Sequence, residues 1–152
     1  RAVNWVGSIT DGPQGNLQQL QEYAQALHSR LGIQVQAHRG VGREEMIRLI
    51  RSSNQAPAIV AGWQKEYMYV PCRIFKNISY GQPTFSNSPV ISELCGEFFY
   101  EEDCAKLALK NSEYLNNRDI KKESEMIKLI KENHTFVNRC QTIIKMVEEI
   151  RK

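Results

Sequence analysis

The side chains best suited to chemistry lie close together near the middle of the sequence. A stretch of fourteen residues brings together aromatic rings, cations and one carboxylate, namely Trp63, Lys65, Glu66, Tyr67, Tyr69, Arg73 and Lys76. Aromatic rings stack on a nucleobase or a sugar, and Arg and Lys bind phosphate groups. If a helix begins at Pro71, then Lys76 and Asn77 follow Arg73 at i, i+3 and i, i+4 and share its face. The segment predicts a site for a phosphorylated ligand, although a core edge with cations extended into solvent fits the same composition.

A second candidate is the glycine-containing turn after the first apolar run. Gly7 and Gly12 both fall in it, with Ser8 directly after the first glycine, and a helix is predicted to follow. Exposed amides and the dipole at the start of a helix favour phosphate. The turn has neither the G-K-[ST] ending of a P-loop nor the G-x-G-x-x-G spacing of a dinucleotide site. We therefore name these three residues as candidate phosphate contacts, and a simple turn at Gly12 remains the alternative.

No side chain is assigned a catalytic role. His134 falls in a predicted break between helices, where a contact with the local backbone accounts for it. Asp11 and Asp103 have no paired carboxylate for acid–base chemistry. The four cysteines form no C-x-x-C pair and are expected to be reduced thiols. The sequence also contains no D-x-D motif.

Short apolar runs that alternate with amphipathic stretches indicate strands connected by helices. Strands are predicted at 2–9, 33–37, 57–63, 83–86 and 97–100. Helices are predicted from Asn16 to Gly32, over 44–53 and from Pro71 to Gly81, and the chain beyond residue 101 is predicted to be helical, with breaks at 116–119 and 133–135. We expect the last helix to pack on the sheet or on a partner domain. This order predicts a single α/β domain over residues 1–152, Rossmann-like and three-layered, with a parallel sheet of about five strands and C-terminal helices.

A parallel sheet would bring the two candidate segments together. Ligands of open parallel sheets bind outside the carboxyl ends of the strands, where the loops that lead into helices gather. The predicted loops of this kind are 8–14, 38–42, 63–70 and 86–89. Both the glycine-containing turn and the aromatic and cationic stretch belong to this set, so we expect them to line one site.

Composition narrows the choice of partners. The formal net charge is +3 and opposite charges are interspersed, so no basic stripe is present to follow a nucleic acid backbone. No run approaches the roughly 20 apolar residues of a membrane span, and no signal peptide opens the chain. We therefore expect a cytoplasmic protein without a membrane span. The chain begins with Arg1 rather than Met, which suggests a piece of a longer protein.

Two motifs resemble a known family. The run V-P-C-R-I-F-K-N-I-S-Y-G-Q-P-T-F-S-N-S at 70–88 is similar to a segment near the end of glycosyltransferases of the GT-B fold, approximately R-x-F-E-A-L-A-x-G-x-P-V-I-x-[ST]. The run H-T-F-V-N-R at 134–139 resembles the H-T-[YF]-x-x-R that ends a CgeB-like branch of the glycosyl transferases of group 1. The order of elements is also similar, so the resemblance covers essentially the whole chain and concerns the C-terminal, nucleotide-sugar-binding domain of those enzymes.

The resemblance implies roles for individual residues. Arg73 matches the arginine that lies beside the donor phosphates, and Gly7 and Ser8 match the first loop, whose backbone approaches the pyrophosphate. The family glutamate that accepts hydrogen bonds from the nucleotide ribose falls on Lys76. Lysine has three donors and no acceptor, so this chain departs from the family at that contact.

The resemblance implies the donor-binding domain of a glycosyltransferase, which transfers a sugar from a nucleotide-diphosphate sugar to an acceptor. An N-terminal acceptor-binding domain would be the partner, and the nucleotide sugar is a substrate rather than a cofactor. Such enzymes generally need no bound metal. Together the two lines of reasoning give the candidate donor-binding residues Gly7, Ser8, Gly12, Trp63, Tyr69, Arg73, Lys76 and Asn77. The alternatives are a non-catalytic binding module with an altered pocket and an epimerase-like domain acting on nucleotide sugars.

Overall fold

A computed structural model describes residues 2–151, and its one regular sheet in that range has two parallel strands. Strand β1 (Ala2–Val6) pairs with β2 (Gln34–His38), so that Val3 lies opposite Val35 and Trp5 opposite Ala37. Helix α1 (Leu17–Leu31) connects them and ends at Gly32, whose φ of 65° is left-handed. The prediction for this first strand–helix–strand unit is confirmed.

The prediction of a Rossmann-like three-layer domain with about five parallel strands is wrong. The segments 57–63, 83–86 and 97–100 form no ladder and meet only in single parallel bridges, Ala58 with Ser86 and Ser86 with Tyr100. The side chain of Asn87 bonds both the N–H (2.8 Å) and the C=O (2.9 Å) of Val60, which replaces a backbone ladder at that point. Pro57 also has no N–H to donate to a neighbouring strand. The last segment forms a 3₁₀ turn, η1 (Glu97–Phe99), instead of a strand.

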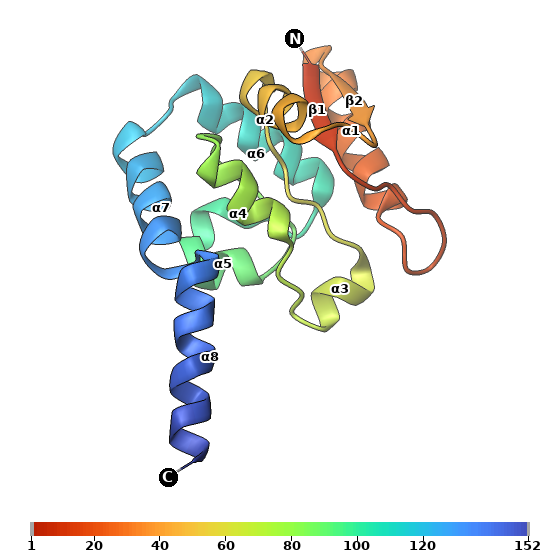
Figure 1. The fold of residues 1–152 in the computed structure, drawn as a ribbon. Helices are drawn as coiled ribbons and strands as arrows, with labels where there is room; N and C mark the ends of the chain where they lie inside the picture. The colour runs from red at the N-terminus through yellow and green to blue at the C-terminus, as the bar shows by residue number, and fades with distance from the viewer. Residues whose placement is uncertain (1, 152) are drawn as a thin grey trace.

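Helices make up most of the described chain (Figure 1). After β2 follow α2 (Arg43–Ser52), α3 (Gly62–Glu66), α4 (Cys72–Ser79), α5 (Val90–Cys95), α6 (Cys104–Asn116), α7 (Ile120–Asn133) and α8 (Phe136–Ile150). The predicted breaks are confirmed, since Asp119 caps the start of α7 and Thr135 caps the start of α8, each by accepting a backbone N–H. The C-terminal part of the prediction is therefore right, whereas 62–66 is helical where the end of a strand and the start of a loop were expected.

The core lies between these helices and the short sheet. Trp5, Tyr23, Phe85 and Phe99 are among the largest fully buried side chains. Helix α1 packs against α6, α4 against α7, and α2 against β1. The arrangement holds the end of β1 and the start of α4 close together, because Ile74 of α4 belongs to the same core cluster as Trp5.

Helix α8 is different from the others because none of its residues is buried. In Figure 1 it extends away from the body of the molecule. Its apolar side chains remain in solvent, with Phe136 84% and Ile150 83% exposed. Of the two alternatives predicted for this helix, packing on the sheet is wrong in the described structure, and packing on a partner domain stays a prediction.

Candidate functional site

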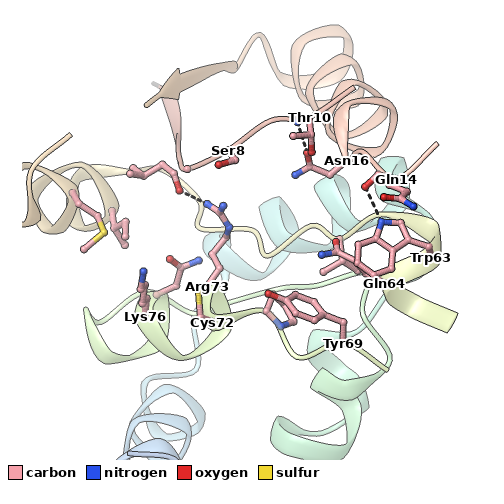
Figure 2. A pocket seen from close by; sticks show the side chains of 17 residues that line it. Ser8, Thr10, Gln14, Asn16, Trp63, Gln64, Tyr69, Cys72, Arg73 and Lys76 are labelled. Atoms are coloured by element: carbon pink, nitrogen blue, oxygen red, sulfur yellow. Dashed lines mark hydrogen bonds between the residues drawn. The ribbon is translucent and has the colours of Figure 1, made fainter. Parts of the chain in front are cut away.

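A pocket of about 420 Å³ opens at the end of β1 (Figure 2). Its walls come from the loop after β1, from α2, from α3 with the segment that follows it, and from the start of α4. Seven of the eight predicted donor-binding residues line it, namely Gly7, Ser8, Trp63, Tyr69, Arg73, Lys76 and Asn77. Two strands thus suffice to bring the glycine-containing turn and the aromatic and cationic stretch to one place.

Gly12 is the predicted residue that does not line the pocket. Its amide donates to the side-chain oxygen of Asp11 at 2.7 Å, and its carbonyl accepts the N–H of Gly15 at 2.9 Å. A Cβ added at Gly12 would meet nothing within 4 Å. The residue belongs to a turn exposed to solvent, the alternative that the sequence left open.

Arg73 is the central group of the pocket. Its guanidinium lies 3.8 Å above the ring of the buried Trp5 and donates a hydrogen bond to the carbonyl oxygen of Val6. Burial lowers the pKa of Arg73 to about 10, so the group is still a cation at neutral pH. Within residues 2–151, the ion pairs involve other cations, and no carboxylate pairs with Arg73. A half-buried cation without a carboxylate favours an anionic ligand.

Gly7 is required for the position of Arg73. Its φ of 135° is unfavourable for residues with a side chain, and a Cβ there would lie 2.6 Å from an Nη atom of Arg73. Its amide donates to the carbonyl oxygen of His38 at 3.0 Å, which fixes the end of β1 against β2. The guanidinium therefore lies directly against the backbone of this turn.

Lys76 and Asn77 share the face of α4 that carries Arg73, as the helical spacing predicted. Asn77 is buried, and its amide nitrogen donates to the carbonyl oxygen of Ala56 at 2.9 Å, so it also holds the segment before the pocket wall in place. Lys76 is exposed, and in the described part of the chain it forms neither an ion pair nor a side-chain hydrogen bond. Its ammonium is therefore available to a ligand.

The aromatic residues form the other end of the pocket. Trp63 is 38% exposed and Tyr69 43% exposed, so both offer ring surface to a ligand. The indole N–H of Trp63 donates to the carbonyl oxygen of Gln14 at 2.7 Å and thereby connects α3 to the loop after β1. Tyr67, which the sequence grouped with them, packs edge-on against Trp63 and does not line the pocket.

Four polar residues that were not among the named donor contacts also line the pocket, namely Thr10, Gln14, Asn16 and Gln64. They lie in the predicted loops 8–14 and 63–70 or at the predicted start of the first helix. The side-chain oxygen of Asn16 accepts the N–H of Thr10 at 3.1 Å and does not cap α1. Met46 and Ile50 of α2 also form part of the wall. Side-chain amides next to the glycine-containing turn are the sequence signal that could have identified polar lining residues. The contribution of α2 has no such signal, because it depends on tertiary packing alone.

The charge of the pocket is one-sided. Arg73 and Lys76 are its cations, and no Asp, Glu or His is among the described residues that line it.

Nowhere in residues 2–151 do three His, Cys, Asp or Glu side chains gather in a way that could hold a metal ion. The helices of the same range include none with the length and apolar character needed to cross a membrane.

No protein-family model, curated protein or solved structure matches the chain. Cations without carboxylate partners bind an anion, exposed rings stack on a flat group, and side-chain amides bond hydroxyl or carbonyl groups.

Proposed function

We propose that the pocket binds a nucleotide-diphosphate sugar and that the protein is the donor-binding part of a glycosyltransferase. The observation that carries the proposal is Arg73, a half-buried cation with no carboxylate partner in the described chain, in a pocket lined by no acidic side chain. A diphosphate supplies the negative charge that this environment lacks.

The size and the aromatic end of the pocket support the same ligand. A volume of about 420 Å³ lies within the range of about 300–1,000 Å³ typical of small-molecule sites. Trp63 and Tyr69 offer ring surface for a base. The resemblance of residues 70–88 to glycosyltransferases adds support, since its arginine lines the pocket and its Gly81 ends the α4 region with a φ of 83°.

In this proposal, the reaction is transfer of the sugar to an acceptor held by an N-terminal acceptor-binding domain. Arg73 and the backbone around Gly7 stabilise the charge that develops on the departing nucleoside diphosphate. The protein's own cations neutralise the phosphates, so the proposal includes no cofactor. We place the protein in the cytoplasm, a proposal supported by its four unpaired cysteines.

A titration with nucleotides tests the proposal. UDP, GDP and ADP are titrated into the wild-type chain, Arg73→Ala and the control Arg30→Ala, which changes an exposed arginine outside the pocket. At about 100 times the Kd, the right nucleotide stabilises the fold by about 2.7 kcal/mol, which raises the Tm by about 5–11 °C. Arg73→Ala weakens this binding about ten- to one-hundred-fold, since a hydrogen bond to a charged group contributes about 1.5–3 kcal/mol. If no nucleotide shifts the Tm at millimolar concentration, the proposal is wrong.

A non-catalytic binding module is the second candidate, and one observation favours it. None of the described residues that line the pocket is an Asp, Glu or His, the side chains that most often serve as general bases. A binding module would hold the nucleotide sugar without consuming it. Release of nucleoside diphosphate over time, measured with the acceptor-binding domain present, separates the two, because turnover is expected only for the transferase.

A further inference from the structure

The cations and the rings of the pocket follow one another in space. Figure 2 shows Lys76 on one side of Arg73 and Trp63 on the opposite side, with Tyr69 on the side of Trp63. A ligand that lies along the pocket meets the aromatic rings first, Arg73 next and Lys76 last. This order fits the base, the diphosphate and the sugar in turn, and it differs from the glycosyltransferase resemblance, in which the position of Lys76 contacts the nucleotide ribose.

A ligand bound in this order would have its sugar beside Lys76. The backbone and the ring of Trp5 fix the guanidinium of Arg73, whereas Lys76 reaches the pocket on an exposed side chain without a carboxylate partner in residues 2–151. An ammonium group donates three hydrogen bonds and accepts none, and it binds a carboxylate more strongly than a neutral hydroxyl group. Since no acidic side chain is among the described residues that line the pocket, none of them would repel a negatively charged sugar.

We propose that the sugar of the donor carries a carboxylate, so that the ligand is a nucleoside-diphosphate hexuronate, and that Lys76 binds this carboxylate. The inference rests on the proposed function, because it takes the diphosphate to lie at Arg73. It adds the class of sugar and makes Lys76 a residue that determines specificity.

Matched pairs of ligands test the inference. UDP-glucose and UDP-glucuronate differ only in a hydroxymethyl group or a carboxylate at the same carbon, and GDP-mannose and GDP-mannuronate form a second such pair. Calorimetric titration gives the Kd of each. In the pair whose base fits, we expect the uronate to bind about five- to thirty-fold more tightly than the neutral sugar, and higher salt to reduce this ratio.

Variants at Lys76 show whether this residue causes the difference in affinity between the uronate and the neutral sugar. Lys76→Ala lowers the ratio of the two affinities to about one, Lys76→Arg keeps most of it, and Lys145→Ala, a change of an exposed lysine on α8, leaves it unchanged. The position is exposed, so the variants are expected to fold, and the Tm of each verifies this.

The negative results of this experiment distinguish a failure of the inference from a failure of the proposed function. Equal affinities within a pair, or a ratio that survives Lys76→Ala, overturn the inference and leave the proposed function in place. A loss of both affinities by the same factor in Lys76→Ala also overturns it, because Lys76 would then bind the diphosphate. If no member of either pair binds, and no free nucleotide does, the proposed function fails and the inference fails with it.

Discussion

Helices α4 and α8 are both amphipathic, but their surroundings differ completely. Helix α4 buries Ile74 and Ile78 in the core and turns its polar face, with Arg73 and Lys76, toward the pocket. Helix α8 has a comparable apolar stripe and buries none of it. The comparison shows that a helical pattern specifies the helix and its two faces, whereas the surface that covers the apolar face comes from the rest of the fold.

The largest expected effect is the difference in stability lost when the same substitution, Ile to Ala, is made in α4 and in α8. Ile74 is 0% exposed, and Ile74→Ala should lower the free energy of unfolding by about 2–5 kcal/mol through lost burial and a cavity. Ile143 of α8 is 60% exposed, and Ile143→Ala should change it by less than about 0.5 kcal/mol. Urea unfolding of both variants measures the difference. Similar costs at the two positions would show that α8 is packed against the body in solution.

The next effect concerns the contact between α4 and the turn after β1. Gly7→Ala should cost about 1–3 kcal/mol, because its φ is strained for alanine and the new Cβ would lie against Arg73. Gly12→Ala is the control, since its φ of 88° is also positive but a Cβ there meets nothing. Both variants should lose stability in thermal unfolding, and only Gly7→Ala should lose nucleotide binding. Intact binding in Gly7→Ala would argue against Arg73 as the phosphate contact.

The smallest expected effect tests whether α8 contributes to the stability of the rest of the fold. The hydroxyl of Thr135 caps this helix by accepting the N–H of Asn138. Thr135→Ala should weaken the helix by about 1 kcal/mol, visible as a loss of helical circular dichroism. Since α8 buries nothing, the midpoint of the main unfolding transition should not move. A shift of that midpoint would mean that α8 contributes to the core.

The sequence predicted local structure well and long-range pairing poorly. Hydrophobic periodicity and Gly32 were sufficient for β1, α1 and β2, because their signals are local. The run at 57–63 was correctly expected to be buried, since Ala58 and Val60 are almost inaccessible, but burial does not determine whether a backbone ladder forms. Asn87 replaces that ladder with its side chain, an interaction that no pattern along the chain reveals.

The site was predictable to the same extent. Helical spacing alone was enough to predict that Arg73, Lys76 and Asn77 share one face, and the loop after β1 was expected beside them. The contacts made by Trp63 with Gln14 and by α2 with the pocket join segments distant in sequence, and they follow only from the tertiary arrangement.

The packing of Arg73 on Trp5 has a consequence for optical measurements. The chain contains two tryptophans, and both belong to the site: Trp5 lies beneath the guanidinium, and Trp63 lines the pocket with its N–H on Gln14. Light that excites tryptophan selectively therefore produces emission only from Trp63 in the pocket wall and from Trp5, which is buried beneath Arg73. The protein's intrinsic fluorescence is in effect a built-in reporter of whether the pocket is occupied.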